Sequence, residues 1–145
     1  VETAAPLRFY LHAGSRVPAH CSASGKVLMA QMSPAQRRRL LAHAPLEQYT
    51  ANTKTDLDAL EEEIRQVRKE GYALDDEEFL PGLFCIAVLV PSPEGRSNMG
   101  IAMQAPIMRM TEQKALESLP ALRRAAAALA AIEAENASPS ESACA

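Results

Sequence analysis

The feature that most constrains this chain is an uninterrupted apolar run at residues 83–90. Eight residues are too few for a membrane span, which needs about 20, and they suit a strand buried in a sheet. A turn sequence at residues 91–96 follows, and residues 98–104 can return beside the run as the second strand of a hairpin. The run therefore predicts a sheet covered by other elements.

Helical periodicity is clearest between residues 57 and 70. Apolar residues recur there at the spacing of one helix face: Leu57, Leu60, Ile64 and Val67. Thr55 or Asp56 can cap the start, and Gly71 suits the C-terminal end. The charged residues on the other faces are interpreted as a solvated surface.

The remaining elements rest on shorter patterns. Strands are predicted at residues 7–12 and 72–74, and helices at residues 26–32, 34–44 and from Thr111 onward. Residues 21–25 are interpreted as a loop, and Pro120 is expected to kink or divide the last helix. This order predicts one domain at residues 1–135, of the α/β or α+β class, with a mainly antiparallel sheet flanked by helices. Residues 136–145 are expected to be a disordered tail.

Charge and cysteine usage exclude several classes of protein. Lys plus Arg is 15 and Asp plus Glu is 18, so the formal net charge is −3, which argues against a free-standing nucleic-acid binder. No apolar run is long enough for a membrane span, and residues 1–6 lack the pattern of a signal peptide. Three widely spaced cysteines do not form a disulfide framework, so a cytoplasmic location is expected.

Two short segments could carry polar chemistry. The small residues Ala23, Ser24 and Gly25 precede a predicted helix, where unpaired backbone N–H groups favour an anion. The alternative is a plain helix start capped by Ser22 or Ser24. The acidic run at residues 75–78 could hold a metal or an acid/base pair, although a solvated turn is the simpler interpretation; Asp75 is the member expected to point inward.

The sequence gives little support for a catalytic nucleophile or for a metal centre. Cys85 lies within the apolar run and is interpreted as a small hydrophobic residue, because no histidine stands at a recognisable catalytic spacing. No metal-ligand spacing occurs, and neither a metal nor a cofactor is predicted. Methionines around the last predicted strand are interpreted as core filler, with an adaptable pocket as the alternative.

Four motifs stand in order along the chain: His20-x-Ser22-x-x-Gly25-Lys26, Tyr49-Thr50-x-Asn52-Thr53, Arg68-x-x-Gly71-Tyr72-x-x-Asp75-Asp76-Glu77-Glu78 and Gly82-Leu83-x-Cys85-Ile86-Ala87. The ordered set resembles the effector-binding domain of IclR-type bacterial transcription regulators across residues 7–132. The resemblance implies a GAF-like fold with a small-molecule pocket and self-association into dimers or tetramers. It also implies a winged helix-turn-helix upstream that binds DNA, an expectation with which the lack of an initiator Met agrees.

The resemblance further implies which residues line the pocket. The backbone amides of Ala23 and Ser24 would hold an organic acid. Side chains of several types would line the rest of the pocket: the acid Asp75, the thiol Cys85, and the apolar Phe9, Val17 and Leu83. Two pocket hydroxyls of the pattern for small 2-oxo acids fall at Ala102 and Gln104, which have none. A larger or differently decorated acid is therefore expected, with Met103 as a further apolar wall.

Two alternatives remain open at this point. One is a GAF-like small-molecule-binding module that serves signalling without DNA binding. The other is a hydrolase that uses Cys85 as its nucleophile, which the lack of a nucleophile–base spacing makes the weaker hypothesis.

Overall fold

The computed structural model describes residues 12–43 and 45–137. Within these ranges the elements follow in the order α1 (Ala23–Ala30), α2 (Pro34–Ala42), α3 (Leu57–Glu70), β1 (Ala73–Asp76), β2 (Leu83–Leu89), β3 (Gly100–Pro106) and α4 (Glu112–Ala137). The predicted strand at residues 7–12 lies outside the described residues apart from His12. No described helix has the length and apolar character that crossing a membrane requires.

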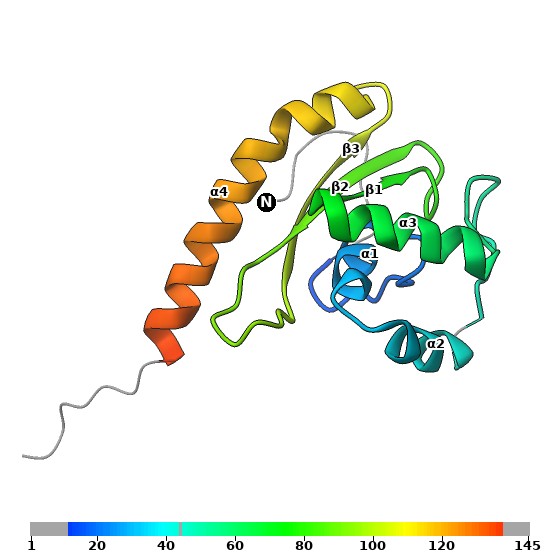
Figure 1. The fold of residues 1–145 in the computed structure, drawn as a ribbon. Coiled ribbons are helices and arrows are strands. Elements are labelled where there is room, and N and C mark those ends of the chain that lie inside the picture. The colour runs from blue at the N-terminus through cyan, green and yellow to red at the C-terminus, as the bar shows by residue number, and fades with distance from the viewer. Residues whose placement is uncertain (1–11, 44, 138–145) are drawn as a thin grey trace, which may run out of the picture.

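The apolar run is confirmed as the central strand of the sheet. The three described strands are antiparallel in the order β1-β2-β3, with β2 in the middle. Helix α1 packs on one face with α3 beside it, and α4 packs on the other face (Figure 1). The predicted fold class, an antiparallel sheet flanked by helices, is therefore confirmed.

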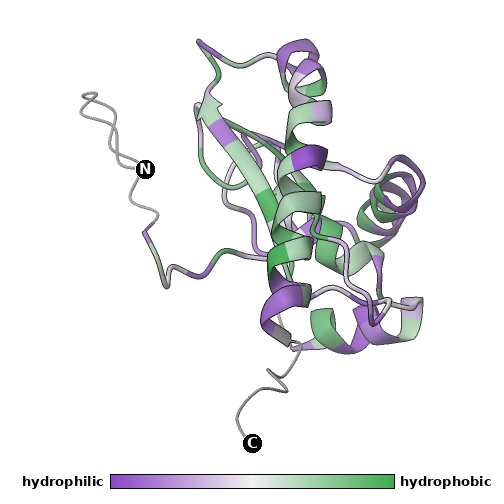
Figure 2. Cartoon of the chain, turned by 90° about the vertical axis from the view of Figure 1, so that its left-hand side faces the viewer, coloured by the Kyte–Doolittle hydropathy of each residue, from purple (hydrophilic) through white to green (hydrophobic). Residues whose placement is uncertain are grey.

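Side chains of β2 alternate between the two faces of the sheet, as the geometry of a strand requires. Leu83, Cys85 and Ala87 join the core beneath α1 and α3, and Phe84, Ile86 and Val88 join the core beneath α4. In Figure 2 the strands are mostly pale to green, and the helices carry both purple and green bands. A strand with two buried faces can carry apolar residues at every position, which explains the unbroken run.

Helix α1 begins at Ala23, three residues before the predicted start. Ser22 has an extended backbone, and its side chain accepts a hydrogen bond from Gly25 N at 3.2 Å. The small residues interpreted as a loop are therefore the first turn of the helix. Helix α2 begins with a capping box of Ser33 and Gln36. The predicted cap at Asp56 and the predicted C-terminal Gly71, which is left-handed (φ +76°), are confirmed at the two ends of α3.

The other differences between prediction and structure are in the ends of strands and of the last helix, which depend on strand pairing and on packing. Strand β1 extends to Asp76, and β3 begins at Gly100 and ends at Pro106, because the register with β2 fixes their ends. Pro120 does not divide α4, which is continuous and includes the first two residues of the predicted tail. Pro120 is exposed, so water can satisfy the carbonyl that loses its helical donor there.

Candidate functional site

The N-terminus of α1 presents backbone N–H groups without an acceptor. The first amides of a helix have no intrahelical partner, and Ser22 serves only that of Gly25. Ser22 itself is held in place, because its hydroxyl donates to Pro18 O at 2.7 Å. Among the described residues, the amides of Ala23 and Ser24 have no acceptor. Together with the helix dipole, they form a position that favours an anion.

Gly25 allows the segment before α1 to lie directly against the helix. A Cβ at this position would lie 2.4 Å from Ala19 O and 2.5 Å from Ala19 Cα. These are backbone atoms and cannot rotate away as a flexible side chain could. The close approach positions the chain at residues 17–20 over the first turn of α1, next to the free amides.

A row of three polar side chains crosses the sheet on the face that α1 covers. The strand register pairs Asp75 with Cys85 and Cys85 with Gln104. Asp75 is 3% exposed and Cys85 is 8% exposed, whereas Gln104 is exposed. The Cys85 thiol lies 3.7 Å from Gln104 Oε1. The structure thus brings together three of the predicted site residues, which lie far apart in the sequence.

The Asp75 carboxylate is bound on one side only. Its Oδ1 accepts hydrogen bonds from Glu78 N at 2.8 Å and from Phe79 N at 3.4 Å, so Oδ2 is the oxygen that remains for a ligand. Burial raises the pKa of Asp75, against the lowering effect of these two bonds and of the Lys26 charge. The inward orientation predicted for Asp75 is confirmed.

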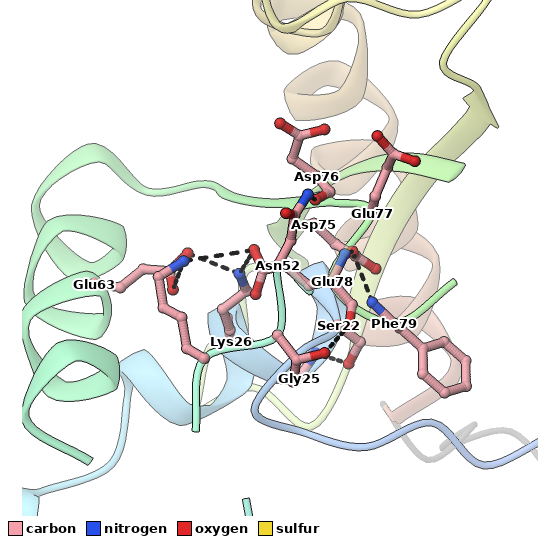
Figure 3. Close-up of polar contacts among 12 residues, drawn as sticks. Ser22, Gly25, Lys26, Asn52, Glu63, Asp75, Asp76, Glu77, Glu78 and Phe79 are labelled. Atoms are coloured by element: carbon pink, nitrogen blue, oxygen red, sulfur yellow. Dashed lines mark hydrogen bonds and ion pairs between the residues drawn. The ribbon is translucent and has the colours of Figure 1, made fainter. Parts of the chain in front are cut away.

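A buried ion-pair cluster lies beside this row. Lys26 is fully buried, and its Nζ is 2.7 Å from both Glu63 Oε1 and Glu78 Oε1 (Figure 3). Lys54 Nζ lies 3.1 Å from Glu63 Oε2. Glu78 Oε2 is buried without a hydrogen-bond partner among the described residues, and burial raises the pKa of Glu78 despite its bond with Lys26.

The acidic run at residues 75–78 forms a turn that its own carboxylates hold in place by hydrogen bonds. Its interpretation as a solvated turn was wrong. Asp75 and Glu78 are buried, and of the four acids only Asp76 is exposed. The Glu77 carboxylate accepts from Gly82 N at 2.7 Å, while the Glu77 backbone is left-handed (φ +55°). Asp75 and Glu77 therefore use their carboxylates to hold the backbone between β1 and β2. No cluster of three side chains that could hold a metal ion occurs within the described ranges.

The motif around residues 50–53 fastens this turn from outside. Thr50 Oγ1 donates to Glu77 O and Thr53 Oγ1 donates to Glu78 O, both at 2.6 Å. Asn52 Nδ2 donates to Asp76 O at 3.1 Å. All four sequence motifs therefore meet in one polar network around the start of α1, the β1–β2 turn and residues 50–53, and the fourth motif joins it through Gly82.

The apolar residues predicted for the pocket lie on different faces of the sheet or outside the described residues. Leu83 is buried on the α1 face, and Ala102 is exposed on β3, paired with Ala87 of that face. Met103 packs instead in the core beneath α4. Successive strand residues point to opposite faces, so Met103 is separated from Gln104 and cannot share its site. Phe9 lies outside the described residues.

Val17 is half-buried and lines a groove of about 540 Å³. The groove also includes His20, Leu41, Tyr49 and Phe79. The rings of Tyr49 and Phe79 meet edge to face with centroids 5.3 Å apart, and His20 Nε2 lies 2.9 Å from Glu47 O. The histidine of the first motif therefore contacts the connection between α2 and α3 at Glu47.

Sequence reasoning missed the roles of Lys26, Glu63 and Glu78. A usable signal was present for Lys26, because it follows Ala23 by three residues and precedes Ala30 by four, which places it on the buried face of α1. A lysine on an apolar helix face requires a buried carboxylate partner. The sequence does not show which of the acids is near, since Glu63 and Glu78 lie 37 and 52 residues away.

The two cysteine thiols among the described residues, Cys21 and Cys85, are unsuited to nucleophilic chemistry. Burial raises the pKa of Cys85 to about 12, and the negative charge of Asp75 adds to that rise. Burial likewise raises the pKa of Cys21 to about 12, with Asp75 and Glu78 contributing. Both thiols are protonated at neutral pH, whereas a cysteine nucleophile acts as a thiolate. The hydrolase alternative therefore has no chemical support at Cys85.

Residues 1–131 match the family described as bacterial transcriptional regulator IclR C-terminal. The probable transcriptional regulator SauR of Cupriavidus necator is 43% identical over 126 residues, which cover 87% of this chain and 50% of that protein. The transcriptional repressor IclR of Escherichia coli is 36% identical over 104 residues, which cover 72% of this chain and 37% of that protein. The chain spans about half the length of these relatives, or less, and they are transcriptional regulators rather than enzymes.

Solved structures show the same arrangement. The inducer-binding domain of PobR from Acinetobacter, a double mutant in complex with 3-hydroxybenzoic acid, has a TM-score of 0.78 at 30% identity, covering 82% of this chain and 69% of that one. IclR of Thermotoga maritima has a TM-score of 0.79 at 28% identity, covering 87% and 51%. The expected GAF-like architecture of IclR C-terminal domains is confirmed.

Replacing Gly25 with alanine should destabilise the domain. Alanine normally stabilises a helix relative to glycine by about 1 kcal/mol, but here the new Cβ meets the backbone of Ala19. We expect the free energy of unfolding in urea to fall by about 1–3 kcal/mol, the usual range for overpacking. Ser24→Ala, one residue earlier, is the control and should remain close to the parent. A Gly25→Ala chain as stable as the parent would contradict the close approach.

Replacing Asp75 with asparagine should flatten the pH dependence of stability. Because burial raises the pKa of Asp75 in the folded state, the folded chain binds its proton more tightly than the unfolded chain, and stability falls as pH rises through the raised pKa. Asparagine can still accept both backbone N–H groups. Urea unfolding from about pH 4 to 7 should show a smaller decline for Asp75→Asn, whereas Asp76→Asn, at the exposed neighbour, should keep the parental slope. An unchanged slope in Asp75→Asn would refute this linkage.

Proposed function

This chain belongs to the IclR family of bacterial transcriptional regulators, and we propose on that basis that its domain senses a small organic acid. Residues 1–131 correspond to the C-terminal, effector-binding domain of the family. The observation that carries the proposal is the pair of free amides at Ala23 and Ser24, beside the row formed by Asp75, Cys85 and Gln104. The acid, its mode of binding and the response to it are parts of the proposal.

The carboxylate of the ligand would bind the amides of Ala23 and Ser24. Ser22 and Gly25 support this assignment, because one caps the helix without using these amides and the other lets the chain pack closely behind them. A buried helix start without acceptors is costly unless a ligand or water supplies them. The carboxylate charge is also favoured by the positive end of the helix dipole.

The rest of the acid would lie along the face of the sheet that α1 covers. Asp75 Oδ2, the Cys85 thiol and the Gln104 amide offer polar contacts, while Leu83 and Val17 offer apolar ones. Ala102 leaves space next to Gln104 on β3. Phe9 would add a further wall. Met103 is not part of the proposed site, because it lies on the α4 face.

Binding of the acid would change the DNA affinity of a longer protein that contains this domain. We propose that a winged helix-turn-helix domain precedes this domain, that the whole protein self-associates, and that it functions in the cytoplasm. The curated relatives support the first point, because the matched part covers only 50% and 37% of their lengths. An acid changes DNA affinity only if it binds two arrangements of domains or subunits unequally. The reading frame upstream of residue 1 tests the domain order directly.

Calorimetric titration of the 145-residue chain with aliphatic and aromatic acids tests the binding site. Ser24→Pro removes one of the two amides at a position where the first turn of a helix tolerates proline, and Ser24→Ala keeps the amide. A hydrogen bond to a charged group contributes about 1.5–3 kcal/mol, so Ser24→Pro should weaken binding roughly 10- to 100-fold. Ser24→Ala should bind as the parent does.

Two results would overturn this assignment. If no acid of either series binds the parent chain, the domain does not sense an organic acid. If an acid binds and Ser24→Pro leaves its affinity unchanged while the fold is intact by circular dichroism, the carboxylate does not occupy the start of α1.

A further inference from the structure

The carboxylates beside α1 outnumber the cations that face them. Glu63 and Glu78 share the buried ammonium group of Lys26, and Lys54 adds a second cation next to Glu63. These two negative and two positive charges balance. Asp75 adds a third carboxylate, which forms no ion pair with any described residue. Because Asp75 is 3% exposed, its charge is largely removed from water, which is costly for an unpaired ion.

The two oxygens of the Asp75 carboxylate have different surroundings. Oδ1 accepts hydrogen bonds from Glu78 N at 2.8 Å and from Phe79 N at 3.4 Å (Figure 3), and it can accept both whether or not the group is ionised. Oδ2 has no partner among the described residues, and it is not one of the oxygens that are fully buried without a partner. A proton bound by Asp75 would therefore lie on Oδ2, the oxygen that solvent or a ligand can reach.

Titratable groups from the elements packed against Asp75 act on its charge. Lys26 of α1 favours the ionised form, and the neighbouring carboxylate of Asp76 opposes it. The thiols of Cys21, before α1, and Cys85, on β2, are protonated at neutral pH and carry no charge. Burial is the largest effect and raises the pKa of Asp75 above its ordinary value. The single ammonium group nearby, already shared by two glutamates, does not reverse that rise.

We propose that the domain binds its acid together with a proton, which Asp75 takes up on Oδ2, so that the acid and the pH are sensed jointly. The inference rests on the proposed function, because it places the ligand carboxylate at the amides of Ala23 and Ser24. It goes beyond that function by assigning a protonation state to the site and a pH response to the sensor.

The reason is the charge that the ligand brings. Two carboxylates that lie close together without a cation between them do not both ionise readily, and the pKa of one of them rises. The backbone amides and the helix dipole hold the ligand carboxylate in its ionised form. Asp75 therefore takes the proton from solvent, and Oδ2 becomes a donor toward the ligand. The site has the same net charge after binding as before it.

Calorimetric titration of the 145-residue chain measures this proton, with benzoate as the aromatic probe and pentanoate as the aliphatic one. Both acids have pKa values close to that of an ordinary Glu, about 4.3, so they are ionised above about pH 5.5. Titrations at one pH in buffers of different ionisation enthalpy give the number of protons taken up per bound acid. Between about pH 5.5 and 8 this number should reach about half a proton or more, and the affinity should fall by up to about tenfold per pH unit.

Asp75→Asn imitates the protonated form. Its amide keeps an acceptor at Oδ1 and carries a permanent N–H donor in place of the Oδ2 proton. The variant should take up no proton, and near pH 8 it should bind the acid about tenfold or more tightly than the parent does. A purely structural role of Asp75 would not make its replacement bind more tightly. Asp76→Asn removes the same charge at the exposed neighbour and should keep the parental proton uptake.

The outcomes separate this inference from the proposed function. If a probe binds and Ser24→Pro weakens it, but the parent takes up no proton, joint sensing is wrong and the effector site stands. If Asp75→Asn still takes up the proton, Asp75 does not hold it and the inference fails. The parental proton number decides alone if this variant does not fold. If neither probe binds, the inference fails, and the proposed function fails with it when no other acid of the two series binds.

Discussion

The buried ammonium group of Lys26 is the constraint on which the rest of the site depends. A charge without access to water is tolerated only when carboxylates surround it, and here Glu63 of α3 and Glu78 of the β1–β2 turn both lie 2.7 Å from it. Each partner belongs to a different element, so α1, α3 and the turn are tied to a single point. Removing one partner of such a group typically costs about 3–5 kcal/mol, which is more than any single cap or surface contact contributes.

This constraint also places the groups that can bind a ligand. Lys26 follows the free amides of Ala23 and Ser24 by less than one helical turn, and Glu78 follows Asp75 by three residues. Fixing Lys26 to Glu78 therefore fixes the amide pair relative to the Asp75 carboxylate. Thr50 and Thr53 support the same arrangement from outside by holding the carbonyls of Glu77 and Glu78. A movement of α1 in response to a ligand would also displace α3, because Lys26 and Glu63 join the two helices.

Local patterns in the sequence predicted the elements whose causes are local. The run at residues 83–90, the apolar face of residues 57–70 and Gly71 are examples. The start of α1 and the limits of β1 and β3 differed by one to three residues, because a cap and a strand register determine them. The resemblance supplied Asp75, Cys85 and Gln104, and the register explains why they meet. The alternation of a strand already separates Met103 from Gln104, so that misplacement was avoidable, whereas the partners of Lys26 required the tertiary fold.

The departure from the family pattern at Ala102 and Gln104 gains a physical meaning from Cys85. A hydroxyl rotates, so it can donate to one ligand and accept from another, and a pocket with two hydroxyls adapts to either. The amide of Gln104 differs, because it carries its donor and its acceptor on separate atoms, and its oxygen lies 3.7 Å from the Cys85 thiol. Burial makes Cys85 a poor nucleophile by keeping its proton in place, and that same proton is the donor in the contact with Gln104 Oε1. An alanine and an amide therefore present different hydrogen-bonding groups on this face of the sheet from two rotating hydroxyls.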